Sequence, residues 1–280
     1  MHPQSSPFTR HRIFRLSSSA SPASPSLLTP HPSLLTPFPM HILQRHEWVL
    51  TAEEAIVIQQ DLRREILTTD DFGTIRHAAG VDVGFESDGT ITRAAIAVLN
   101  LDDLQLQDRA IARRPTTFPY IPGFLSFREV PAVLDALEKI RIIPDLLLCD
   151  GQGIAHPRRF GIACHIGLLT NIPAIGVAKS LLVGKHAALS DERGSWQPLI
   201  HRGETIGAAL RTRPGTKPLY ISPGHRVSLE TAIAYVMRCT TKYRLPETTR
   251  HAHKLASGPA IDQPTLPDAP TQQISLDFGS

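Results

Sequence analysis

Four charged residues in this 280-residue chain stand where acids and bases can do chemistry, at the ends of apolar runs or beside an unusual loop. They are Asp82 in AAGVDVGF, Glu129 after PYIPGFLSFR, Asp150 at the end of PDLLLCD and Lys179 after IPAIGVA. An ionised carboxylate beside a buried strand is costly unless a counter-charge or a metal compensates it. Three carboxylates from distant segments therefore suggest one shared cation site. Hard oxygen ligands suit Mg²⁺, with Mn²⁺ as a substitute, and such ions hold carboxylates and phosphate together.

Each of the four residues also has an ordinary structural explanation. Asp82 and Asp150 could cap strand ends, and Glu129 at a helix start would complement the helix dipole. Lys179 could hold a phosphate or simply lie in solvent. The chain has no GxSxG, HExxH or CxxC motif and no GK[ST] phosphate loop, so none of these motifs competes for the chemistry.

A stiff loop, PYIPG at residues 119–123, precedes Glu129. Its two prolines hold the backbone extended and present Tyr120 and Ile121. An aromatic or apolar side chain on such a loop is suited to wedging into a stack of bases. The alternative is a buried turn with the tyrosine in the core.

The net positive charge of the chain is confined to its N-terminal segment. Residues 1–40 contain three arginines and no acid, which accounts for the whole net charge of +3. Residues 41–280 therefore balance at zero, and a nucleic-acid footprint must be a local patch. The arginine pairs at 113–114 and 158–159 are candidate members of such a patch, with ordinary solvated surface as the alternative.

Composition divides the chain into three regions. Residues 1–39 form a Ser/Pro-rich leader that we expect to be disordered, whether it is a transit peptide or a mis-assigned start before Met40. Residues 40–256 are long enough for a single domain with a sizeable core, and residues 257–280 are expected to be a flexible tail. The three cysteines show no paired or zinc-like spacing, which is typical of core residues in a reducing compartment. No apolar run approaches the length of a membrane span. The lack of a signal peptide and of a disulfide pattern predicts a cytoplasmic protein.

The apolar patterns predict a mixed α/β sheet flanked by helices. Alternating or continuous apolar runs predict strands at 78–85, 91–100, 104–112, 145–150, 173–178, 205–211 and 218–222. Helical spacing predicts helices at 53–66, around 133–140, at 160–169 and at 228–237. Beyond Leu245 the chain turns polar. Functional groups gather at the carboxyl ends of parallel strands, so pairing of the first strand with 145–150 would bring Asp82 and Asp150 to one edge.

Several long motifs occur in a characteristic order between about His46 and His253. They are PYIPG, FRE, CDGQG followed by AHPR, GIA-H-GLLT, GVAKS and SPGHRVSLE. In this order and spacing they closely resemble the endonuclease V family of deaminated-base repair nucleases. The resemblance implies an RNase H-like sheet and a Mg²⁺-dependent nuclease. It also implies recognition of hypoxanthine in damaged DNA by base flipping, with hydrolysis of the second phosphodiester bond on its 3′ side.

The resemblance also assigns roles to individual residues. The catalytic acids and metal ligands would be Asp82, Glu129 and Asp150, and the other catalytic residues would be Lys179 and His253. The strand-separating wedge would be Pro119, Tyr120, Ile121 and Pro122. The pocket for the flipped base would be lined by Leu125, Gly151 and Ile162, with His156 near the scissile region.

The chain departs from the family pattern in three places. Thr248 in PETTR replaces a common proline, and the RHAH that follows offers either His251 or His253 as the last site residue. The leader at 1–39 has no counterpart in the family.

Two other functions stay open from the sequence. One is an inosine-specific endoribonuclease with the same fold, and the other is a module that binds deaminated bases without cutting. Three metal-type acids argue against the pure binder.

The tail carries a separate motif. Its residues Gln273, Ile274, Leu276 and Phe278 resemble the short peptides that dock into bacterial sliding clamps. The alternative is an incidental polar tail.

Overall fold

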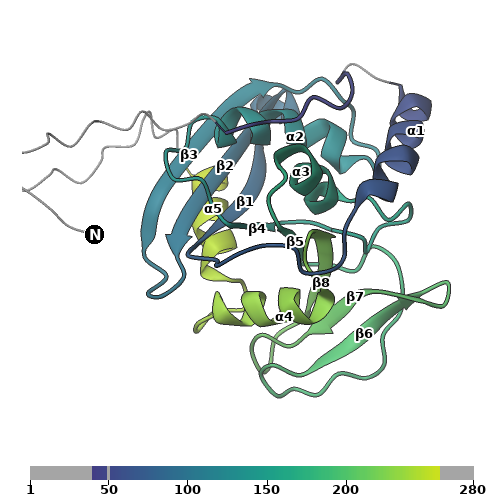
Figure 1. The fold of residues 1–280 in the computed structure, drawn as a ribbon, viewed down its shortest axis with the longest axis vertical. Coiled ribbons are helices and arrows are strands. Elements are labelled where there is room, and N and C mark those ends of the chain that lie inside the picture. The colour runs from purple at the N-terminus through teal and green to yellow at the C-terminus, as the bar shows by residue number, and fades with distance from the viewer. Residues whose placement is uncertain (1–39, 49–50, 259–280) are drawn as a thin grey trace, which may run out of the picture. The chain divides into compact units, whose positions relative to one another are not determined.

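An eight-stranded sheet with helices on both faces forms the part of the chain that the computed structural model describes, residues 40–48 and 51–258 (Figure 1). The strands are β1 (His77–Glu86), β2 (Ile91–Asn100), β3 (Leu106–Pro115), β4 (Leu146–Cys149), β5 (Ala174–Ala178), β6 (Trp196–His201), β7 (Glu204–Leu210) and β8 (Leu219–His225). The helices are α1 (Ala52–Leu62), α2 (Leu125–Leu137), α3 (Ile162–Thr170), α4 (Leu229–Arg238) and α5 (Glu247–Ser257), with short 3₁₀ turns η1 (Arg63–Glu65) and η2 (Ser87–Gly89). The leader at 1–39 and the clamp-like peptide at 273–278 lie outside the described residues.

The sheet is mixed, as the sequence predicted. Its strand order is β3-β2-β1-β4-β5-β8-β7-β6. Strands β1, β2 and β3 form an antiparallel meander, whereas β1 pairs with β4, and β4 with β5, in parallel. Strands β8, β7 and β6 continue the sheet in antiparallel fashion. The carboxyl ends of β1, β4 and β5 therefore lie along one edge.

A tight turn joins β1 to β2 in an antiparallel hairpin. Ser87, Asp88 and Gly89 have φ angles of 50°, 53° and 86°. Aspartate and glycine tolerate this left-handed region well. The tight turn sets Asp82 opposite Ala95 in the register of the hairpin.

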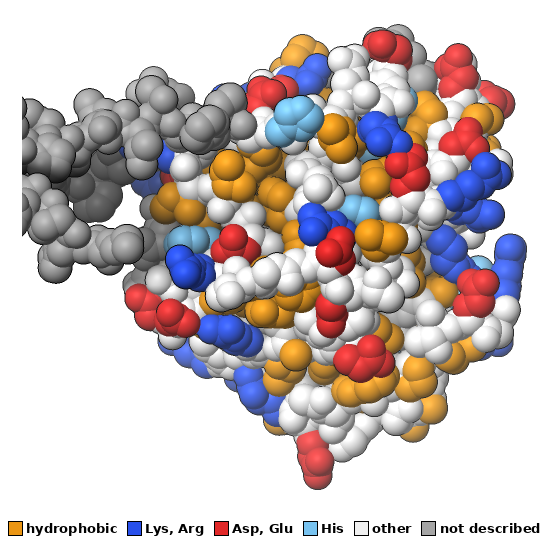
Figure 2. Space-filling model, viewed as in Figure 1, with side chains coloured by type: hydrophobic (Ala, Val, Ile, Leu, Met, Phe, Trp, Pro, Cys, Tyr) orange, Lys and Arg blue, Asp and Glu red, His pale blue; other side chains and the backbone are white. Residues whose placement is uncertain are grey.

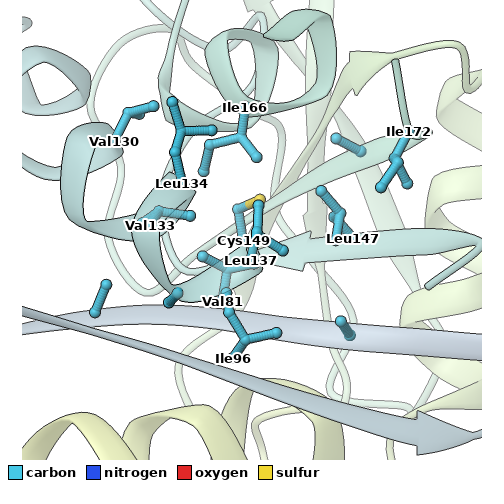
Figure 3. Packing of buried hydrophobic residues seen from close by; sticks show 14 of the residues in the cluster. Val81, Ile96, Val130, Val133, Leu134, Leu137, Leu147, Cys149, Ile166 and Ile172 are labelled. Atoms are coloured by element: carbon cyan, nitrogen blue, oxygen red, sulfur yellow. The ribbon is translucent and has the colours of Figure 1, made fainter. Parts of the chain in front are cut away.

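Alternate strand residues bury two different faces of the sheet. On one face, apolar side chains of β1, β2 and β4 pack against α2 and α3 (Figure 3); they include Val81, Ile96, Leu147, Cys149, Val130, Val133, Leu137 and Ile166. On the opposite face, Leu146 and Leu148 pack in one cluster with Ala232 and Val236 of α4. None of the helices in the described part of the chain has the length and apolar character that a membrane span requires.

Helix α5 lies directly against β1 and was not predicted, because its sequence is largely polar. Its apolar residues Ala252, Leu255 and Ala256 are buried against β2. Two glycines make the approach to β1 very close: a Cβ on Gly80 would lie 2.0 Å from the Thr248 carbonyl oxygen, and a Cβ on Gly84 would lie 2.6 Å from the Ala256 carbonyl oxygen. Strand β6 was not predicted either.

The close contact of α5 with β1 leads to a stability prediction. Gly80→Ala should lower the free energy of unfolding by about 1–3 kcal/mol, because the added methyl group must push the helix backbone away. Urea denaturation measures the change. Gly73→Ala is the matched control, since a Cβ there meets nothing within 4 Å. Equal stability of the two variants would show that the packing of α5 on β1 does not require a glycine at position 80.

Candidate active site

The parallel pairing of β1 and β4 brings two of the predicted acids together. Val81 pairs with Cys149, and the Asp150 N–H donates to the Val81 carbonyl oxygen at 2.9 Å. Asp82 and Asp150 come directly after these two paired residues. Asp82 is on the α5 face of the sheet, because its strand neighbours Val81 and Val83 pack toward α2 and α3.

Helix α5 adds a histidine to this pair of acids. His253 Nδ1 lies 2.7 Å from Asp82 Oδ2. Ligand atoms of Asp82, Asp150 and His253 all lie within 4.8 Å of one another. Of the two histidines in RHAH, the structure thus places His253, and not His251, in this group.

Lys179 stands at the end of β5, the next parallel strand, and its ammonium group forms an ion pair with the Asp150 carboxylate. The backbone at this point is fixed by Arg244, whose guanidinium donates to the carbonyl oxygens of Lys179 and Pro218, each at 2.8 Å. Sequence reasoning missed Arg244. It lies in the polar segment before α5, where no periodic pattern marks it.

Glu129 approaches the acids from the opposite face of the sheet. It lies in the second turn of α2 and is only 7% exposed, so a role at the helix start does not explain it. Burial raises the pKa of Glu129 well above its ordinary value, and the negative charges of Asp82 and Asp150 raise it further. Glu129 is not among the three residues whose ligand atoms lie within 4.8 Å of one another.

The charge balance of the site fits a divalent cation. Burial and the neighbouring Asp82 raise the pKa of Asp150 to about 6, against the opposing effect of Lys179. The surrounding protein groups thus raise the pKa of both Asp150 and Glu129. A bound divalent cation would act in the opposite direction and stabilise the ionised carboxylates. Carboxylate oxygens are the ligands that Mg²⁺ and Mn²⁺ prefer, so the donor set fits such a metal.

A pocket of about 340 Å³ opens beside the acids, and Asp150 and Lys179 form part of its wall. The three residues predicted to surround a flipped base, Leu125, Gly151 and Ile162, all line it. Gly151 has a φ angle of 146°, and a Cβ there would lie 2.6 Å from Ile162 Cγ2. A side chain at this position would therefore close the pocket against Ile162.

The predicted wedge forms one rim of the pocket. Tyr120 is 71% exposed, so the alternative of a tyrosine in the core is wrong. Ile121 and Pro122 line the pocket with it, and Pro119 is exposed beside them. The loop is anchored on both sides by phenylalanines of one buried cluster, Phe118 and Phe124.

His156 also lines the pocket, but its ring is committed to structural hydrogen bonds. The side chain is 4% exposed; its Nε2 lies 3.0 Å from the Gly123 carbonyl oxygen and its Nδ1 accepts from the Arg158 N–H at 3.2 Å. Since a carbonyl can only accept, Nε2 carries the proton. Burial, followed by the charge of Arg158, lowers the pKa of His156 to about 4, so the ring is neutral near pH 7.

The two arginine pairs, which were candidate members of a basic patch, are bonded to acids or to the backbone of the protein itself. Arg113, Arg114 and Arg159 pair with the acids Glu86, Asp135 and Glu204, and Arg158 donates to the Gly123 carbonyl oxygen. Acidic and basic side chains are interspersed over the face seen in Figure 2. Lys179 is a basic residue that forms an ion pair with one of the acids, Asp150.

Known proteins resemble this chain in sequence and in structure. The family model for endonuclease V matches residues 60–254. Endonuclease V of Trichormus variabilis is 68% identical over 219 residues, which cover 78% of this chain and 99% of that protein. The crystal structure of endonuclease V from Streptomyces avermitilis gives a TM-score of 0.72 at 41% identity, covering 77% of this chain and 95% of that chain.

A third similar protein was crystallised with nucleic acid. Endonuclease V of Ciona intestinalis, in complex with a 24-mer DNA containing an inosine followed by a ribo-adenosine, gives a TM-score of 0.62 at 27% identity. The match covers 73% of this chain and 95% of that chain. The ordered motifs, the mixed sheet and these matches agree, and the chain belongs to the endonuclease V family of nucleases.

Proposed function

We propose that this protein is a metal-dependent endonuclease that extrudes hypoxanthine from damaged DNA and hydrolyses the second phosphodiester bond on the 3′ side of the lesion. The observation that carries the proposal is that a base-sized pocket lies directly beside a cluster of acids. Asp150 belongs to that cluster, and both Asp150 and its partner Lys179 line the pocket. Further support comes from the Ciona protein, which is bound to inosine-containing DNA.

The acid cluster has the groups that phosphodiester hydrolysis needs. Asp82, Asp150 and Glu129 would hold Mg²⁺, which supplies charge neutralisation and lowers the pKa of bound water. Lys179 can contact a non-bridging phosphate oxygen from its place beside Asp150. The Asp82 carboxylate can only accept a hydrogen bond, so His253 donates to it from Nδ1.

The pocket supports recognition by base flipping. Its volume lies within the range of about 300–1,000 Å³ that is usual for small-molecule sites. Extruding a base costs a few kcal/mol and costs least where pairing is already weakened, as it is for a deaminated purine. Tyr120 is exposed at the rim, where it can fill the gap left in the stack.

An inosine-specific endoribonuclease is the second candidate. In the Ciona complex a ribo-adenosine follows the inosine of the bound DNA, which places a ribose directly after the lesion in that protein's ligand. Cleavage rates on matched inosine strands of DNA and RNA decide between the two substrates.

The first prediction of this proposal concerns metal binding and pH. Mn²⁺ should raise the melting temperature more at about pH 7.5 than at about pH 5, because the pKa of Asp150 lies near 6 and a proton occupies the ligand below that pH. One displaced proton corresponds to roughly a tenfold loss of apparent affinity per pH unit. Differential scanning fluorimetry measures the shift, with Asp150→Asn as the control that loses it at both pH values. A shift of equal size at both pH values would contradict the assignment.

Removing the acids tests the chemistry. Asp82→Ala and Asp150→Ala should each lower Mg²⁺-dependent nicking of inosine DNA by about 10²–10³-fold or more, since each removes a group that stabilises charge at the phosphate. A gel-based nicking assay with and without EDTA gives the rates, and circular dichroism checks folding. Asp61→Ala, at an exposed acid on α1, is the control. Full activity of either site variant would exclude the acid cluster as the catalytic centre.

The wedge has its own prediction. Tyr120→Ala should weaken binding of inosine duplex by about 5- to 150-fold, the equivalent of the 1–3 kcal/mol typical of one base–aromatic stack. Binding of an inosine single strand should change less, because no opposing strand must be separated. Fluorescence anisotropy measures both affinities, and Tyr120→Phe should keep the wild-type values. Unchanged duplex affinity in Tyr120→Ala would refute the wedge.

A further inference from the structure

Gln59 of α1 is a buried glutamine beside the pocket. Its side chain is only 1% exposed, and it shares the buried face of the helix with Ala55 and Leu62. A buried amide is costly unless its donors and acceptor are all bonded. No sequence pattern marks this residue, because an isolated glutamine in an amphipathic helix is usually a surface residue.

The hydrogen bonds of Gln59 connect the two walls of the pocket. Its Nε2 donates to the carbonyl oxygen of Gly123 at 3.1 Å and to that of Phe160 at 3.3 Å, while its Oε1 accepts from Arg158. Gly123 ends the wedge loop. Phe160 lies two residues before Ile162, the start of α3, which lines the opposite wall. One side chain thus bonds to both walls.

The apolar neighbours of Gln59 repeat this arrangement. Ala55, one turn earlier, packs in a cluster with Phe118 and Phe124 at the base of the wedge loop. Leu62, one turn later, packs with Phe160 and residues of α3. Helix α1 therefore spans from one wall to the other, with the glutamine between its two apolar contacts.

The Gly123 carbonyl oxygen is held especially firmly. Besides Gln59, it accepts from Arg158 Nη2 at 2.6 Å and lies 3.0 Å from His156 Nε2. The Arg158 guanidinium also lies 4.3 Å from the centre of the Phe124 ring. Three donors on one carbonyl fix the end of the wedge loop at a single position relative to the opposite wall.

We propose that Gln59 is a positioning residue that sets the separation of the wedge loop from the α3 wall, and thereby the selectivity of the pocket for the extruded base. The inference rests on the proposed function. Asp82, Asp150 and Lys179 are held by strands of the sheet and not by α1, so a change in α1 should affect binding of the base and not the hydrolytic residues. Loosening the walls should therefore weaken lesion binding and leave the hydrolytic step intact.

The experiment compares Gln59→Leu with Gln60→Leu, the same change at the adjacent exposed position of α1. Both are assayed with Mg²⁺ on an inosine-containing single strand, and an unmodified strand serves as competitor. Gln59→Leu should raise KM about tenfold, the loss expected from one or two hydrogen bonds, with kcat within about twofold of the wild type. Its preference for the inosine strand over the competitor should fall by a similar factor. Gln60→Leu should match the wild type.

A second variant guards against loss of folding. Gln59→Glu keeps the size of the side chain and the acceptor for Arg158 but loses both donated bonds, so it should show the same rise in KM. Equal KM values for the Gln59 and Gln60 variants, with a wild type that cleaves, would overturn the inference alone. A loss of kcat without a change in KM would also overturn it. A wild type that does not cleave the inosine strand would refute the proposed function and the inference together.

Discussion

The carboxylates of Asp82, Glu129 and Asp150 lie close together in a partly buried site and repel one another. The sheet and helix α2 hold them there despite that repulsion. The pKa values of Glu129 and Asp150 are raised by burial and by neighbouring carboxylates. Lys179 offsets part of the negative charge through its ion pair with Asp150, and His253 lies 2.7 Å from the Asp82 carboxylate on another side. Such an arrangement is unfavourable for the isolated fold and favourable once a divalent cation is bound.

The elements around the site divide into a rigid part and an adjustable part. Asp82, Asp150 and Lys179 come from adjoining strands, and the register of the strands fixes their spacing. Glu129 comes from helix α2, which packs on the sheet. The pocket walls are loops that depend on side-chain bonds for their position, notably those converging on the Gly123 carbonyl oxygen. The two parts meet at Asp150 and Lys179, which belong to both.

Much of the fold could be predicted because burial leaves a local pattern in the sequence. Within the predicted strand at 145–150, residues 146–149 are continuously apolar because β4 is covered on both faces, and Asp150 follows β4 directly. Helix α5 could not be found this way, because its position depends on backbone contact with Gly80 and Gly84 of a distant strand. Those two glycines, four residues apart on one face of β1, were the available signal.

The predicted site shows the same limit. The acids, the exposed tyrosine and the pocket glycine could be identified from motifs, whereas Arg244 and Gln59 act through bonds to backbone carbonyls that no sequence pattern reveals. The expected role of His156 near the phosphate rested on its position in a motif. In the fold its two ring nitrogens are both used to hold the pocket wall.

The place of α5 at the end of the described chain has a consequence for synthesis. Asp82, Asp150 and Lys179 precede His253 in the chain, so they are synthesised before it. Until α5 emerges, Asp82 lacks its histidine partner and the apolar face of β2 is uncovered. A chain that stops before α5 therefore carries Asp82, Asp150 and Lys179 without the histidine that α5 sets beside Asp82.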